Sequence, residues 1–301
     1  MNYFLLALSV CANVAYSSFY NYFGKKAVKE RSDNYRINMC IYSVAAVILV
    51  AISIISGFKA SLFTVLFGIA FGAVTALSGI FKLNALNCGP MSFTILLITS
   101  SMILPAFSGY IIWDESLSVW KIVGTVLMIV AAYFSTEKKK DGKGASAKWL
   151  IFCFLAFLFM GSIGIMQKTQ QKSSFASETG AFLAIAFVSA AILCTVSYFV
   201  SSRGKKEKTE EKGIDTKKLL LLTVICGAFI AFLNKVNLYL SGVLDSAVLF
   251  PIQNGGTTMM SVVVAMTLFR EKVSGRRLVG MIIALCALLI LAFSELLAKI
   301  S

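Results

Sequence analysis

Two lysine–asparagine pairs lie inside otherwise apolar stretches of this 301-residue chain. Lys82 precedes Asn84 by two positions, and Lys235 precedes Asn237 by two positions. Charged and carboxamide side chains are costly to bury among apolar groups, so they usually face a cavity or a partner. If both lysines line one pathway, the pathway carries positive charge near both ends, which suits a carboxylate or a phosphate. The alternative is that each lysine lies near the end of its stretch and reaches the interface with its long side chain.

Further polar residues form a stripe on the first apolar stretch. Asn13, Tyr16 and Tyr20 recur every three to four residues, which places them on one face of a helix. Gln167 lies at the end of a later apolar stretch. These four residues are predicted to line a substrate pathway.

Two adjacent carboxamides, Gln253 and Asn254, follow Pro251. Proline removes one backbone hydrogen bond from a helix and can expose carbonyl groups to a ligand. Both carboxamides are unlikely to find partners on the neighbouring backbone, so they are predicted substrate ligands. For single Ser and Thr residues nearby, we favour hydrogen bonds to the preceding helical turn or across a helix interface over a role in ligand binding.

Residue types that enzymes and metal sites need are scarce. The chain has no His, and its seven cysteines are scattered singly through apolar runs. Their spacing matches neither a metal site nor a redox motif, so we expect small buried hydrophobic residues there. The sequence predicts no enzyme, no catalytic residue, no metal and no cofactor.

The composition indicates whether water or lipid surrounds the elements that carry these residues. Hydrophobic residues make up 58% of the chain, charged residues make up 14%, and the mean hydropathy is +0.84. A chain of this composition cannot cover its apolar surface with its own polar groups, so lipid must cover it. We expect an all-α integral membrane protein.

Apolar runs of membrane-spanning length predict about ten transmembrane helices. Five spans fall in each half of the chain. Because five is an odd number, the second half enters the membrane from the opposite face, so the two halves are inverted relative to each other. The predicted domains are a first repeat over 1–137, a linker over 138–147 and a second repeat over 148–301. The predicted spans are 3–23, 37–57, 61–83, 90–113, 119–136, 148–167, 178–201, 218–239, 245–269 and 277–298.

A short motif supports the duplication. Three residues recur at one constant spacing, namely Glu115 with Glu271, Ser118 with Ser274 and Gly124 with Gly280. We interpret both glutamates as caps for the N-terminus of the helix that follows each of them. The glycines are predicted to let the last helix of each repeat approach a neighbour closely.

The chain resembles the drug/metabolite transporter superfamily with its EamA-type repeat. The residues that carry the resemblance are Trp113-Asp114-Glu115-Ser116-Leu117-Ser118 with Gly124, and Phe269-Arg270-Glu271-Lys272-Val273-Ser274 with Gly280. The resemblance implies a secondary carrier with a central cavity walled mainly by the third, fourth, eighth and ninth helices. Its cargo would be a small polar metabolite resembling an amino acid, a sugar or an organic anion. The alternative within the same fold is a flippase for a lipid-linked intermediate.

Basic residues predict the orientation. The net charge is +14, and the loops after the odd-numbered spans hold most of the Lys and Arg. The loops after the even-numbered spans hold only Lys59, Lys168 and Lys172. By the positive-inside rule the odd loops are cytoplasmic, so both termini are predicted to lie outside the cell membrane. The expected partners are the substrate and the lipid bilayer but no nucleic acid, and the protein is expected to be a monomer or a homodimer.

Overall fold

The computed structural model describes residues 1–27, 31–88, 91–116, 118–135, 146–202, 216–267 and 274–294, and every regular element within these ranges is helical. The helices are α1 (Asn2–Ala27), α2 (Arg31–Ile55), α3 (Leu62–Cys88), α4 (Met91–Thr99), η1 (Ser100–Met102), α5 (Ile103–Trp113), α6 (Val119–Ser135), α7 (Ala147–Lys172), η2 (Ala176–Glu178), α8 (Thr179–Ser202), α9 (Thr216–Val243), α10 (Ser246–Thr267) and α11 (Gly275–Ala292). The all-α prediction is confirmed.

Each predicted apolar stretch coincides with helical structure, with one irregularity. The stretch predicted over 90–113 is divided into α4 and α5 by the 3-10 turn η1. Pro105 follows this turn closely and offers no N–H to the carbonyl one turn earlier, which favours such a break. Pro251, by contrast, lies inside the continuous helix α10.

Within the described residues, six helical segments are long and apolar enough to cross a membrane. They are Tyr35–Ile55, Leu62–Leu86, Leu96–Trp113, Ala147–Lys172, Ala176–Val200 and Leu220–Val243. Two shorter apolar helices run over Val119–Phe134 and Leu278–Ala292. Large apolar side chains stay exposed along these elements, for example Ile192 at 58% and Ile282 at 63%. A surface of this kind suits lipid, so the protein is a multi-pass membrane protein.

The chain divides into two compact units. Unit 1 comprises Met1–Val14, Leu77–Gln171 and Asn237–Ser301, and unit 2 comprises Ala15–Ala76 and Lys172–Val236. Each unit therefore draws on both predicted repeats. Residues 138–145 of the predicted linker lie outside the described part of the chain.

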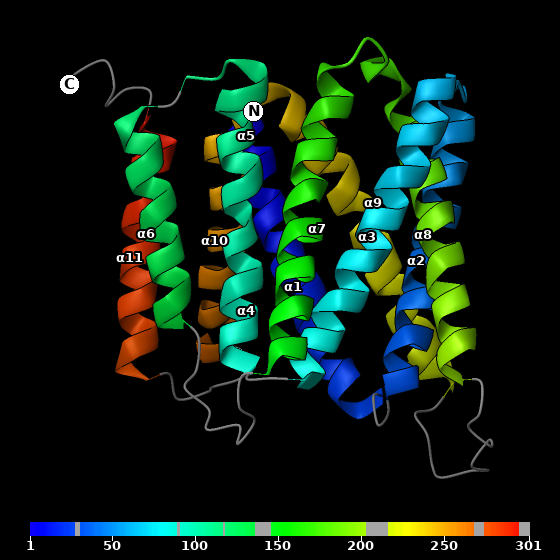
Figure 1. The fold of residues 1–301 in the computed structure, drawn as a ribbon, viewed down its shortest axis with the longest axis horizontal. Helices are drawn as coiled ribbons and strands as arrows, with labels where there is room; N and C mark the ends of the chain where they lie inside the picture. Colours follow the sequence, from blue (N-terminus) through cyan, green and yellow to red (C-terminus); the bar gives the residue numbers. More distant parts are fainter. Residues whose placement is uncertain are drawn as a thin grey trace. The chain divides into compact units, whose positions relative to one another are not determined.

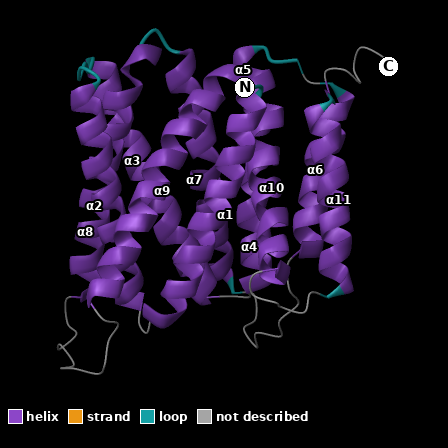
Figure 2. Ribbon diagram, turned by 180° about the vertical axis from the view of Figure 1, so that it is seen from behind, coloured by secondary structure: helices purple, strands orange, loops and turns teal. Residues whose placement is uncertain are grey.

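Unit 2 is built around α2, α8 and the first part of α3. Helices α2 and α8 run side by side (Figure 2). Helix α3 approaches α8 closely at Gly72, where a Cβ would overlap Ala186 O and lie 2.9 Å from Ala186 C. At the start of α3, Glu178 accepts hydrogen bonds from the Ser61 N–H (2.9 Å) and the Ser61 hydroxyl (2.8 Å).

Unit 1 is centred on α10, which packs against α5, α6 and α11. Helices α6 and α11 lie side by side along their length (Figure 1). The closeness predicted for Gly124 is confirmed, since a Cβ there would lie 2.6 Å from Leu291 Cγ on α11. Gly255 of α10 gives similar room to Met128 of α6, whose Cε would lie 3.0 Å from an added Cβ. These contacts fix α10, which carries the polar residues discussed next.

Candidate functional site

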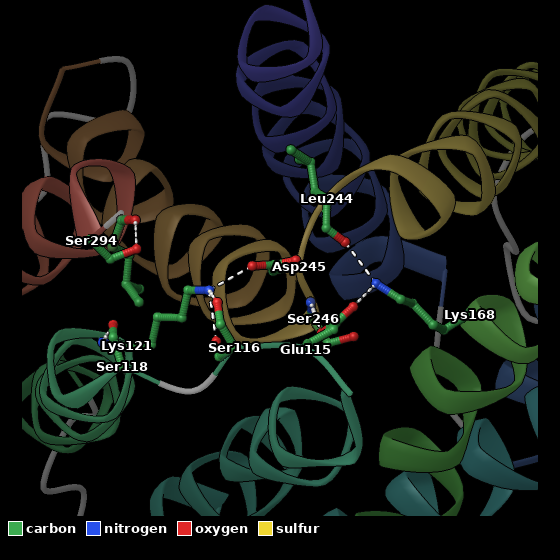
Figure 3. A network of polar contacts seen from close by, with 10 residues as sticks. Glu115, Ser116, Ser118, Lys121, Lys168, Leu244, Asp245, Ser246 and Ser294 are labelled. Carbon is green, nitrogen blue, oxygen red and sulfur yellow. Dashed lines mark hydrogen bonds and ion pairs between the residues drawn. The ribbon is translucent and has the colours of Figure 1, made fainter. Parts of the chain in front are cut away.

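Two polar networks meet α10, and the first is ionic. Glu115, in the connection between α5 and α6, forms an ion pair with Lys168 of α7. Its other carboxylate oxygen accepts a hydrogen bond from the Ser246 N–H at 2.8 Å, at the first residue of α10 (Figure 3). Lys168 is 2% exposed and also donates to the Leu244 carbonyl oxygen at 2.8 Å. Glu115 thus joins α7 to the start of α10.

A second ion pair extends this network. The Lys121 ammonium group lies 2.5 Å from Asp245 Oδ2, next to the start of α10 (Figure 3). It also donates to the Ser116 carbonyl oxygen at 2.8 Å and to the Ser116 hydroxyl at 3.1 Å. The Lys121 side chain is 1% exposed, whereas that of Asp245 is 31% exposed. The four charges balance, so the two buried ammonium groups are each neutralised by a carboxylate.

The prediction that Glu115 caps the helix that follows it is wrong. Glu115 caps α10, which is distant in sequence, and not α6, which follows it. The cap of α6 is Ser118, whose hydroxyl accepts from the Lys121 N–H at 3.3 Å. A carboxylate suits the positive end of a helix dipole whether or not the helix is adjacent in sequence. Glu271 lies outside the described residues, so its role stays a prediction.

The end of α5 holds Glu115 in place. Asp114 adopts the left-handed conformation with φ of 52°, and its N–H donates to the Gly109 carbonyl oxygen. The Glu115 N–H donates to the same oxygen at 3.2 Å. Aspartate tolerates this conformation better than most residues do. The Glu115 side chain passes over Gly109 of α5, which leaves room for the carboxylate, and reaches the start of α10.

The second network is neutral and joins three helices of unit 1. The Ser9 hydroxyl of α1 donates to Asn237 Oδ1 of α9 at 2.7 Å. It accepts a hydrogen bond from Gln253 Nε2 of α10 at 3.3 Å. Ser9 is fully buried, and Gln253 is 7% exposed. We call these three residues the Ser9 chain.

A neighbouring contact links the same two helices, α1 and α10. Asn13 Nδ2 donates to the Thr257 hydroxyl at 3.4 Å. Thr257 in turn donates to the Gln253 carbonyl oxygen at 2.6 Å. Three predicted pathway residues, Asn13, Asn237 and Gln253, are therefore brought together in unit 1.

Other predicted site residues have different surroundings. Asn254 is exposed, and its Nδ2 donates to the Phe250 carbonyl oxygen of its own helix at 3.0 Å. Asn84 is 7% exposed, and its Oδ1 is buried without a hydrogen-bond donor among the described residues. Gln167 is buried in α7 beside Lys168. Gln253 reaches another helix and Asn254 does not, so the two adjacent carboxamides differ in role.

Both predicted lysines are exposed, Lys82 in unit 1 and Lys235 in unit 2. Exposure fits a pathway as well as a side chain that reaches the interface, so both interpretations stay open. Tyr16 belongs to unit 2 and packs against the cluster of Ile37, Ile41, Leu222 and Cys226. The side chain of Tyr20 lies outside the described residues.

Three residues of these networks were not predicted. Ser9 lies one helical turn before Asn13, so extending the polar stripe by one turn would have included it. Lys168 was assigned to a loop, but α7 continues to Lys172 and buries it. Lys121 lies in the first turn of α6. A lysine close to a span end resembles an interfacial residue until its counterion is known.

The described polar side chains of unit 1 are mainly hydrogen-bonding groups and paired charges. Among the described residues there is no group of His, Cys, Asp or Glu suited to a metal. The seven cysteines are free thiols, and Cys153, Cys194 and Cys226 are buried. The Ser9 chain offers carboxamide and hydroxyl groups, which bind polar solutes by hydrogen bonds.

Comparisons with known proteins support the fold. A solved crystal structure of a protein superposes with a TM-score of 0.74 at 13% identity, covering 98% of this chain and 97% of that chain. A Haemophilus influenzae protein described as uncharacterized is 25% identical over 196 residues, which are 65% of this chain and 64% of that relative. The match therefore spans less than two thirds of the relative. No protein-family model matches the chain.

Proposed function

We propose that this protein is a secondary carrier of the EamA type in the drug/metabolite transporter superfamily. It moves a small polar metabolite across the cell membrane by alternating access, with the binding site in the pathway that contains the Ser9 chain. The ten helices form two inverted repeats of five spans in this proposal. No chemical step is required of the protein.

One observation carries the proposal. Asn237 and Gln253, from α9 and α10, bond to one buried hydroxyl on α1, and Asn13 contacts the same α10 helix. Polar side chains at membrane depth are costly, and they persist where they line a pathway or join helices. A site built from three helices can change its access when those helices move relative to one another.

A flippase for a lipid-linked intermediate is the second candidate. The exposed Lys82 and Lys235 favour it, because an ammonium group suits the phosphate of a lipid head group. The two candidates differ in cargo and not in fold.

Reconstitution in liposomes tests the proposal. Purified protein is placed in vesicles that are preloaded with a mixture of amino acids, sugars, nucleobases and organic acids. These vesicles should exchange at least one labelled solute faster than protein-free vesicles do. The same vesicles should not accelerate the transfer of a labelled lipid with a phosphate head group between leaflets. Lipid transfer without solute exchange would instead support the flippase.

The basic loops make a separate prediction about orientation. A reporter that is active only in the cytoplasm should be inactive when fused after Ser301 and active when fused after Lys140, in the basic segment between the repeats. Activity at both positions would contradict the proposed orientation. It would leave the carrier proposal intact.

A further inference from the structure

In the Ser9 chain, one hydroxyl group bonds to two carboxamides. These two bonds determine which carboxamide groups face away from Ser9 and are left for a ligand. A hydroxyl group has one proton to donate. Ser9 donates it to Asn237 and accepts from Gln253. One carboxamide therefore turns its oxygen towards Ser9, and the other turns its nitrogen.

The groups that the two carboxamides turn away from Ser9 are consequently opposite in type. With the bonds as described, Asn237 retains its Nδ2 donors and Gln253 retains its Oε1 acceptor. The oxygen and nitrogen of a carboxamide can be exchanged by a flip. If both carboxamides are flipped, Asn237 retains an acceptor and Gln253 a donor. In either case one carboxamide turns its whole NH2 group away from Ser9 and the other turns its whole carbonyl group away, while each group that bonds to Ser9 keeps a second N–H or a second lone pair.

No charge enters this arrangement. All three members of the Ser9 chain are neutral, and the two buried lysines among the described residues of unit 1 are paired with carboxylates, Lys168 with Glu115 and Lys121 with Asp245. A carboxylate can only accept hydrogen bonds, so it would bond to the N–H groups but leave the carbonyl group that faces away from Ser9 unpaired and next to its negative charge. An ammonium group can only donate and meets the converse mismatch. Buried polar groups left unpaired cost binding energy.

We propose that the Ser9 chain selects an uncharged substrate group in which a hydrogen-bond donor lies beside an acceptor, as in a carboxamide, a lactam or the edge of a nucleobase. This inference rests on the proposed function and narrows its cargo. Ser9 is a positioning residue here, since it is fully buried and acts by fixing the two carboxamides. The proposed substrate class does not include organic anions.

Thermal unfolding with defined probes tests the inference. Uracil and nicotinamide carry the proposed group, succinate at neutral pH is an acceptor only, and putrescine is a donor only. At least one of the first two should raise the melting temperature in a concentration-dependent way, because a ligand stabilises the state that binds it. Succinate and putrescine should not raise it. Stabilisation by an acceptor-only or donor-only probe alone, or by no uncharged probe, would overturn the inference.

Variants connect the response to the Ser9 chain. Ser9→Ala should raise the probe concentration needed for half of the shift by about tenfold. Ser241→Ala is the matched control, because Ser241 is equally buried but donates only to the Leu238 carbonyl oxygen of its own helix at 2.7 Å. Equal effects of the two substitutions would contradict the inference.

Two further measurements remove ambiguity. Asn237→Asp keeps the shape of the side chain but removes the Nδ2 donors, so the uracil or nicotinamide response should be lost even if Ser9→Ala folds poorly. Liposome uptake separates this inference from the proposed function. Uptake of succinate with no effect of Ser9→Ala would overturn the substrate class and keep the carrier, whereas absence of any solute uptake would overturn the carrier.

Discussion

Replacing Glu115 with alanine should lower the free energy of unfolding by about 3 to 5 kcal/mol. The variant leaves the Lys168 ammonium group 2% exposed and without its carboxylate. It also removes the acceptor of the Ser246 N–H at the start of α10. A buried charge that loses its partner costs far more than the intact pair contributes, because the desolvation penalty is no longer offset.

The double variant separates the charge from the packing. Glu115→Ala with Lys168→Met should be more stable than Glu115→Ala alone, because no buried ammonium group is left unpaired. Titration with a denaturing detergent in mixed micelles measures the four states of the cycle. Additive losses would contradict the ion-pair account.

Glu178 provides the matched control. It also accepts the N–H at the start of another helix, from Ser61 at 2.9 Å, but no lysine or arginine pairs with it in the ion pairs of the described residues. Glu178→Ala should therefore cost about 1 kcal/mol, the usual value of a lost helix cap. A loss as large as that of Glu115→Ala would show that capping, and not the buried lysine, dominates.

Replacing Gly109 with alanine should lower the free energy of unfolding by about 1 to 3 kcal/mol. An added Cβ would overlap Glu115 Oε2 and lie 2.8 Å from Glu115 Cδ and 2.9 Å from Ser246 Cβ. The carboxylate cannot move aside freely, because Lys168 and the Ser246 N–H hold it. The added methyl group on α5 would therefore press against both the connection that holds Glu115 and the start of α10.

The mechanism predicts non-additivity with Glu115. In the Glu115→Ala background most of the overlap is gone, so Gly109→Ala should cost less than it does in the original protein. The same detergent titration measures this difference. Gly275→Ala is the control, since an added Cβ there meets nothing within 4 Å. An equal cost of Gly109→Ala in both backgrounds would mean that the clash lies elsewhere.

The helices could be predicted because membrane helices are determined mainly by local composition. Long apolar runs bounded by charged residues identify α2, α3 and α7 without knowledge of their neighbours. The break between α4 and α5 was less accessible, since Pro105 allows several local geometries. Only packing selects the 3-10 turn at Ser100–Met102.

The partner of Glu115 could not be predicted, because the sequence neighbour and the spatial neighbour differ. A carboxylate in a connection can cap any helix whose N-terminus lies within reach. The nearest helix in sequence is α6, yet the residue that donates to Glu115 is Ser246 of α10. Lys168 was misassigned for the same reason, since its counterion is remote in sequence.

Part of the neutral site was predictable from periodicity. Asn13, Asn237 and Gln253 were singled out as polar residues within apolar helices, and they meet in unit 1. Periodicity did not distinguish Gln253 from Asn254, because adjacent residues differ in the face of the helix they occupy. The contact with Ser9 depends on how α1, α9 and α10 pack.

Solute exchange by liposomes carrying Asn237→Leu or Asn234→Leu tests the central claim most directly. The two asparagines lie on α9, but Asn237 bonds to Ser9 of α1 whereas Asn234 donates to the Ile230 carbonyl oxygen of its own helix at 3.0 Å. With the labelled solute that wild-type vesicles exchange, Asn237→Leu should slow exchange at least about tenfold. Asn234→Leu should retain most of it. An exchange rate for Asn237→Leu equal to that of the wild type, or an equal loss of rate in both variants, would contradict a pathway through the Ser9 chain.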